Sequence, residues 1–134
     1  MIIISFQIFL ISFLINLLWE VIHSQLYETC LKTSLKEFIP LIIGASLKDG
    51  FWILGFYLTS VFIFEEINIL ANPLQLSVFI LLALLFSFID EKTAIKLKRW
   101  EYSKQMPKIF GVGITPLLEL AITGILTFFY VFLI

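Results

Sequence analysis

Residues 74–89 read LQLSVFILLALLFSFI and contain no charged side chain. The run follows Asn72-Pro73, a dipeptide typical of turns. With a more polar continuation to residue 97, it is long enough for a helix that crosses the hydrocarbon core of a bilayer, which takes about 20 residues. Three other apolar segments are as long, at residues 2–22, 38–64 and 114–134. We therefore predict an all-α fold, a polytopic membrane protein whose single domain is a bundle of four transmembrane helices.

The composition of the whole chain points to the same class of protein. Of its 134 residues, 60% are hydrophobic and 14% are charged, and the mean hydropathy is +1.05. A soluble domain carries about 25% charged residues, so the sequence argues against a soluble, disordered or nucleic-acid-binding protein. Cys30 is the only cysteine, which excludes an intrachain disulfide. The first apolar segment has neither a basic start nor a small-residue cleavage site, so we interpret it as a retained span.

Basic residues are confined to two connections and to one position inside the second span. Lysine and arginine mark cytoplasmic loops, so we predict that both connections face the cytoplasm and that both termini face outward from the plasma (inner) membrane. The expected partners are membrane lipids with anionic head groups and no nucleic acid, and homo-oligomer formation is left open. The connection between the first two spans holds Lys32 and Lys36. The connection between the last two spans holds Lys92, Lys96, Lys98, Arg99, Lys104 and Lys108.

Polar residues recur on one face of the first span. At about 100° per residue they form a single stripe about 80° wide. Lipid cannot satisfy such groups, so the stripe must face other helices. The fourth span repeats the pattern with Thr115, Glu119 and Thr123. The stripe on the first span consists of Ser5, Ser12, Asn16, Glu20, His23 and Tyr27.

Each span also carries an acidic residue near its predicted cytoplasmic end. At a rise of about 1.5 Å per residue, these acids lie about 6 to 15 Å inside the membrane, where ionisable groups are costly and usually functional. We predict one polar cavity that opens to the cytoplasm, and a purely structural hydrogen-bond network is the alternative. The predicted catalytic residues are Glu20, His23, Asp49, Asp90 and Glu119, and the predicted substrate-binding residues are Asn16, Trp19, Tyr27, Trp52, Arg99, Trp100, Tyr102 and Thr115.

The pair Glu20-x-x-His23 has the spacing that di-iron carboxylate bundles use twice. His23 is the only histidine, so a two-histidine metal site cannot form within one chain. A site of carboxylates and one histidine stays open, but the sequence favours a hydrogen-bonded pair that acts as an acid–base group or a structural lock. We therefore expect no metal and no cofactor.

Other chemistries are disfavoured. The segment Gly111-Val-Gly113 lacks the rest of a phosphate-binding loop. Asp49 and Asp90 lie toward the inner side, which argues against an aspartic signal peptidase with its catalytic pair on the outer side. Residues 99–107 read RWEYSKQMP, and two interpretations of this segment remain. It is either an aromatic anchor at the head-group level or a lid that covers the cavity and holds a head group or an acyl chain.

Two patterns resemble those of a group of small four-helix membrane proteins found in prokaryotic genomes. One is Asn16-x-x-Trp19-Glu20-x-x-His23-x-x-x-Tyr27. The other is Arg99-Trp100-x-Tyr102-x-x-x-Met106-Pro107, followed by Gly111-x-Gly113-x-Thr115-Pro116. Together with Asp49 the resemblance covers nearly the whole chain, and it implies no activity.

A second resemblance is to the lycopene cyclase domain of carotenoid synthesis. It rests on Trp100-x-Tyr102, Gly111, Pro116 and Glu119. The family has paired acids after the proline, whereas this chain has two leucines and then a single glutamate. This resemblance implies isoprenoid chemistry.

The leading hypothesis is a membrane-embedded enzyme that acts on a lipid or an isoprenoid by redox-neutral proton chemistry, such as cyclisation, isomerisation or hydration. Glu20 and Glu119 would supply the acid–base function, supported by His23, Asp49, Asp90 and Asn16. The first alternative is a small proton-coupled transporter, which needs a pathway from both sides of the membrane. The second is a structural or assembly protein, in which the polar cluster only locks the helices together.

Overall fold

The computed structural model describes all 134 residues. Its four long helices are α1 (Ile2–His23), α3 (Leu35–Phe64), α4 (Pro73–Lys96) and α5 (Ile114–Leu133). All four are long and apolar enough to cross a membrane. The predicted all-α architecture is confirmed, and the largest difference from the predicted spans is that α3 begins at Leu35 and not at residue 38.

Short elements form the connections. A 3-10 turn, η1 (Ser24–Leu26), and α2 (Glu28–Leu31) follow α1, and η2 (Ile69–Ala71) precedes α4. The strands β1 (Lys108–Ile109) and β2 (Val112–Gly113) form a small antiparallel hairpin just before α5. The sequence predicts only a turn in this region, because strands of two residues leave no periodic pattern.

Local sequence explains several helix ends. Pro73 occupies the first position of α4, where its missing N–H is not needed, and the Asn72 side chain accepts hydrogen bonds from the backbone N–H groups of Leu74 (3.1 Å) and Gln75 (3.3 Å). The helix α3 ends at Phe64, and the next residue, Glu65, adopts the left-handed conformation with φ of 55°. Such a residue terminates a helix because the chain can no longer continue the i to i−4 bonding pattern.

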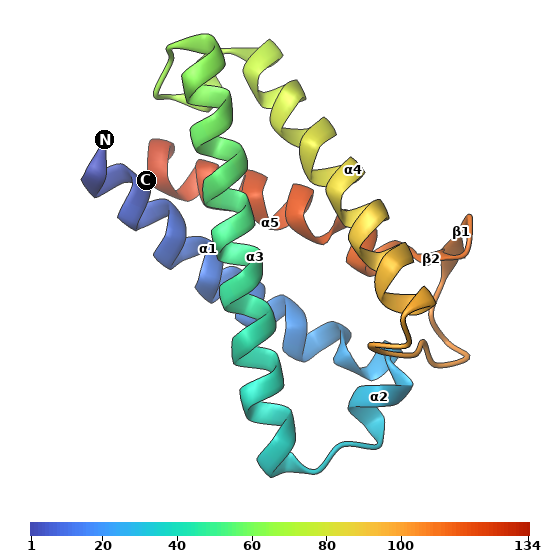
Figure 1. Cartoon of the computed structure of the whole chain (residues 1–134). Coiled ribbons are helices and arrows are strands. Elements are labelled where there is room, and N and C mark those ends of the chain that lie inside the picture. Colours follow the sequence, from blue (N-terminus) through green and yellow to red (C-terminus); the bar gives the residue numbers. More distant parts are fainter.

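The helices are arranged with both termini at one end of the molecule (Figure 1). α1 packs against α5, and α3 and α4 cross this pair, diverging from the connection that joins them at residues 65–72. The two basic connections meet at the opposite end, where Tyr27 and Tyr102 form a backbone bridge. This is the arrangement that four antiparallel spans require.

The half of the bundle nearer the termini has an apolar core. Phe79 of α4 packs edge-on against Phe128 of α5, with ring centroids 4.7 Å apart. The Phe79 ring also lies directly over Gly124, where an added Cβ would come within 2.7 Å of Phe79 Cε1. Many apolar side chains on the outer faces are exposed, as expected for surfaces that contact lipid. The buried core cluster is Ile8, Ile53, Tyr57, Ile69, Phe79, Ala83, Leu120, Ala121 and Phe128.

The polar stripe of α1 faces inward as predicted, since Ser12, Asn16, His23 and Tyr27 are all buried. The polar side chains nearer the start of α1 form hydrogen bonds within the helix itself. The Ser12 hydroxyl donates to the Phe9 carbonyl at 3.0 Å, and Asn16 Nδ2 donates to the Ser12 carbonyl at 2.8 Å. The polar side chains from Glu20 onward instead contact residues of other helices.

Candidate active site in an acidic cavity

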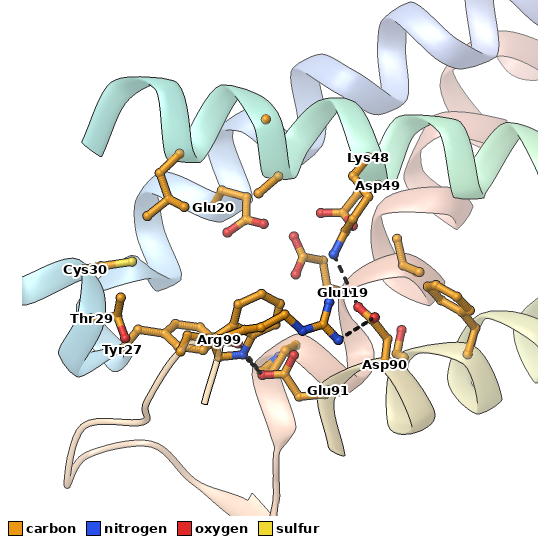
Figure 2. A pocket seen from close by; sticks show the side chains of 18 of the residues that line it. Glu20, Tyr27, Thr29, Cys30, Lys48, Asp49, Asp90, Glu91, Arg99 and Glu119 are labelled. Carbon is orange, nitrogen blue, oxygen red and sulfur yellow. Dashed lines mark hydrogen bonds and ion pairs between the residues drawn. The ribbon is translucent and has the colours of Figure 1, made fainter. Parts of the chain in front are cut away.

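A cavity of about 410 Å³ lies at the end of the bundle that faces the two basic connections. Its wall includes one of the four predicted acids from each long helix: Glu20 of α1, Asp49 of α3, Asp90 of α4 and Glu119 of α5. The predicted convergence of these acids is therefore confirmed. Figure 2 shows the carboxyl groups of Glu20, Asp49 and Glu119 pointing toward one another.

The centre of the cluster is the contact between α1 and α5. His23 Nε2 lies 2.9 Å from Glu20 Oε2 and 4.0 Å from Glu119 Oε2. The exposed fractions of these side chains are only 7% for His23, 13% for Glu20 and 8% for Glu119. Glu119 Oε1 and His23 Nδ1 are buried and have no hydrogen-bond partner. One oxygen or nitrogen atom from each of the three residues lies within 4.8 Å of the others, so this is the group that could hold a metal ion.

The basic side chains of the cavity are held on its other side. Lys48 Nζ is 3.3 Å from Asp90 Oδ2 and 3.8 Å from Asp49 Oδ1, and the Arg99 guanidinium is 3.6 Å from Asp90 Oδ1. Asp90 is thus neutralised by two cations, whereas neither cation pairs with Glu20 or Glu119. Because five acidic side chains line the cavity against two basic ones, the cavity as a whole is acidic.

Glu91 is the fifth acid, and it organises the cavity floor. Its Oε1 atom accepts three hydrogen bonds, from Tyr27 Oη (2.7 Å), Trp100 Nε1 (2.9 Å) and Tyr102 Oη (2.9 Å). Burial and the negative charge of Glu91 raise the pKa of Tyr27 and the pKa of Tyr102. Both phenols therefore stay protonated at physiological pH and keep donating to Glu91.

The segment 97–107 closes the end of the cavity. Arg99 and Trp100 belong to the cavity wall, and the Trp100 ring lies under Lys48 Nζ at 5.7 Å and the Arg99 guanidinium at 5.4 Å. The segment is fastened to the α1–α3 connection by backbone bonds, from Glu28 N–H to the Glu101 carbonyl and from Ser103 N–H to the Leu26 carbonyl. Trp100 and Tyr102 thus turn their polar atoms inward onto Glu91.

Several predicted site residues lie outside the cavity wall. Asn16 and Trp19 are deeper in the α1 packing, and His23 and Tyr102 reach the cavity only through the acids they contact. The Trp52 ring packs in a tilted arrangement against Phe86, with ring centroids 4.1 Å apart, and Trp52 has 39% of its surface exposed. The Thr115 hydroxyl donates to Met106 Sδ at 3.5 Å.

Lys48 and Glu91 are polar residues of the second and third spans that are not among the predicted site residues, yet the structure places them at the centre of these interactions. Five of the six buried residues of α4 lie four positions apart and the last of these five is Glu91, whereas the sixth, Ala94, breaks the spacing. The other wall residues absent from the prediction include the apolar positions of α3 and α4. The four-residue series is Gln75, Phe79, Ala83, Ser87 and Glu91.

No family model, curated protein or solved structure matches the chain. The function is therefore argued from the geometry of the cavity.

The single cysteine gives a first test of the electrostatics of the cavity. Burial raises the pKa of the Cys30 thiol, and the negative charge of Glu20 raises it further. Because the thiolate is the reactive form, iodoacetamide should alkylate Cys30 more slowly in the folded protein than in the unfolded chain at pH 7.5. Glu20→Gln should speed the alkylation at this pH by about twofold or more, as followed by mass spectrometry.

The matched control is Glu37→Gln, which removes an exposed acid from the first turn of α3. This variant should alkylate at the wild-type rate. Equal rates for wild type and Glu20→Gln would contradict the electrostatic influence of Glu20 on the thiol.

Proposed function

We propose that the protein is a membrane-embedded enzyme that carries out proton chemistry on a lipid or an isoprenoid bound in the acidic cavity. The proposed orientation places the two basic connections and the cavity at the cytoplasmic side of the plasma membrane, with both termini outside. One observation carries the proposal: a cavity lined by five carboxyl groups also has an apolar wall. Such a combination suits a substrate with an oily chain and a reactive group that gains or loses a proton.

The apolar wall offers a route for a lipid chain. Pro40, Leu41 and Gly44 of α3 and Phe86 of α4 line the cavity, in the region where α3 and α4 have diverged (Figure 1). The outer surface of α3 beside this wall is apolar and exposed, with Ile39 51% exposed. A substrate dissolved in the inner leaflet therefore approaches the acids sideways, without leaving the hydrocarbon layer.

The acids are arranged for proton transfer within the cavity. In an isomerisation, a carboxyl group donates its proton to one carbon of a double bond, and a carboxylate removes a proton from the neighbouring carbon of the resulting cation. The substrate then has an unchanged composition, and the cluster regains the proton that it gave. Neighbouring carboxylates and the face of Trp100 stabilise positive charge that develops on the substrate. Asp90 is paired with Lys48 and Arg99, so its negative charge is compensated within the cavity wall.

The apolar core favours an enzyme over the transporter. Side chains such as Ile8, Tyr57 and Phe128 are fully buried between the cavity and the end with the termini. A transporter alternates access between both sides, and these packed apolar side chains argue against an open route from the acidic cavity to the second side, although Gln75, Thr123 and Thr127 are also buried in the bundle. The structural alternative is separated by experiment, because a mere lock tolerates glutamine in place of the acids with a loss of stability alone.

The test is lipid extraction and mass spectrometry of cells with and without the protein. Wild type should change the amount of one lipid or isoprenoid species, and Glu20→Gln, Glu119→Gln and Asp49→Asn should each reduce that conversion about 100-fold or more. Each variant is first shown to reach the membrane in a folded form. Gln variants that convert the lipid as wild type does would contradict the proposal, as would a folded wild type that changes no lipid.

A steric pair of variants tests the place of binding. A side chain added at Gly44 has open space and extends into the cavity, so Gly44→Phe should abolish the conversion while leaving the fold intact. Gly55 lies on the same helix, also has open space beside it and is not part of the cavity wall. Gly55→Phe should therefore keep wild-type conversion.

A further inference from the structure

We propose that Glu20, His23 and Glu119 bind one divalent transition-metal cation at the inner wall of the cavity. This inference departs from the expectation of a metal-free site that the sequence favours. It rests on the distances between the three side chains, on their burial and on a carboxylate oxygen that no group of the protein satisfies.

The distances suit a cation placed between the three residues. Two ligands that each lie about 2.1 Å from a tetrahedral or octahedral metal are about 3.0–3.5 Å from each other. His23 Nε2 is 2.9 Å from Glu20 Oε2 and 4.0 Å from Glu119 Oε2. Small side-chain rotations of the two glutamates therefore bring all three donor atoms to coordinating positions. Glu20 and His23 come from successive turns of α1, and Glu119 faces them from α5.

The free oxygen of Glu119 is the independent sign of a ligand. Glu119 is 92% buried by the measure of its side chain, and its Oε1 atom has no hydrogen-bond partner. A buried polar atom without a partner is costly, and an ionised carboxylate in a membrane interior is more so. Neither Lys48 nor Arg99 forms an ion pair with Glu119, since both are paired with the aspartates. A divalent cation would balance the two glutamates at once.

The donor atoms also indicate the class of metal. One imidazole nitrogen and two carboxylate oxygens suit Mn²⁺, Fe²⁺ or Zn²⁺ better than soft Cu⁺ or hard Ca²⁺. Three protein ligands leave at least one coordination position free, and both glutamates belong to the cavity wall. The free position is therefore accessible from the cavity.

Cation binding does not depend on the proposed function. A role of the cation in catalysis does depend on that function. With Glu20 and Glu119 occupied as ligands, Asp49 is the neighbouring carboxyl group that stays available to carry the proton. Asp49 points toward the two glutamates (Figure 2). Asp49→Asn should therefore lose lipid conversion and keep cation binding.

Binding is measured with Mn²⁺ on the full chain in detergent micelles, after treatment with a chelator and its removal. The electron paramagnetic resonance signal of free Mn²⁺ should reveal one bound ion per chain, displaced by Zn²⁺. Pulsed measurements should show nitrogen coupling from a coordinated imidazole, which only His23 can provide. This readout uses the wild-type protein and does not depend on any variant folding.

Variants then assign the ligands. His23→Gln and Glu119→Gln should weaken Mn²⁺ binding by about tenfold or more. Cys30→Ser and Glu37→Gln should bind as wild type does, because neither residue belongs to the group of Glu20, His23 and Glu119: Cys30 lies elsewhere in the cavity wall and Glu37 is an exposed acid. Absence of nitrogen coupling, or undiminished binding by His23→Gln, would overturn the metal site.

The outcomes also separate the two proposals. A protein that converts lipid but binds no Mn²⁺ overturns the metal site alone. A protein that binds Mn²⁺ through the imidazole but changes no lipid overturns the proposed function alone.

Discussion

Replacing Glu91 with alanine should lower the melting temperature of the protein in detergent micelles by about 10 °C, corresponding to about 2–4 kcal/mol of unfolding free energy. The Glu91 side chain is buried, and one of its oxygens accepts all three hydrogen bonds from Tyr27, Trp100 and Tyr102. Alanine leaves three donors without an acceptor. The Tyr27 hydroxyl is the most costly of them because Tyr27 is only 7% exposed, whereas the other two are half-buried and can bind water.

Besides lowering the stability of the whole protein, Glu91→Ala should loosen the segment 97–113. Without Glu91, the Trp100 and Tyr102 side chains lose their hydrogen bonds to α4, so trypsin should cut the segment 97–113 faster in the variant than in wild type. Glu91→Gln keeps an acceptor oxygen and should lose less stability. The matched control is Glu37→Ala, the same substitution at an exposed position. A melting temperature for Glu91→Ala equal to that of Glu37→Ala would refute the central role of Glu91.

The second large effect concerns a close contact between α4 and α5, at Gly124 and Phe79. Gly124→Ala should destabilise the bundle by about 1–3 kcal/mol, the usual cost of an extra methyl group in a packed core. The added Cβ would lie within 2.7 Å of Phe79 Cε1, and a real contact of that length forces the ring or the helix to move. Thermal unfolding followed by tryptophan fluorescence measures the change.

Gly55→Ala provides a control of opposite sign. Gly55 is also inside a long helix, but an added Cβ meets nothing within 4 Å, so alanine should leave stability unchanged or raise it by up to about 1 kcal/mol. Trimming the ring in the double variant Gly124→Ala with Phe79→Leu should recover part of the loss, since the two positions share one contact. Equal effects of alanine at the two glycines would exclude the close packing described for Phe79.

The helices and the convergence of the acids follow from the sequence because both depend on short-range regularities. Apolar runs of sufficient length fix the four helices, and the rise per residue fixes how deep Glu20, Asp49, Asp90 and Glu119 lie in them. Short connections force the helices to run antiparallel. Acidic side chains at similar depths in different helices therefore lie close to one another. The roles proposed for these acids remain predictions.

The remaining parts of the cavity depend on how helices rotate and tilt against one another, which no local pattern contains. Trp52 follows Asp49 by three residues, yet its ring packs against Phe86 of α4 and is not part of the cavity wall. Glu91 bonds to Tyr27 across 64 positions of the chain. The hairpin turn places Phe110 at a positive φ of 51°, a conformation that the residue type does not suggest.

The pairing of α1 with α5 has a consequence for how the chain is made. Glu20 and His23 leave the ribosome early, but Glu119, the acid that faces them, emerges only after α3 and α4 have been synthesised. During that interval α1 carries two ionisable groups without the partner that completes their cluster. We therefore expect that, in a membrane, the chain is most accessible to quality-control proteases before α5 joins α1, and that an insertase holding α1 until then would protect it.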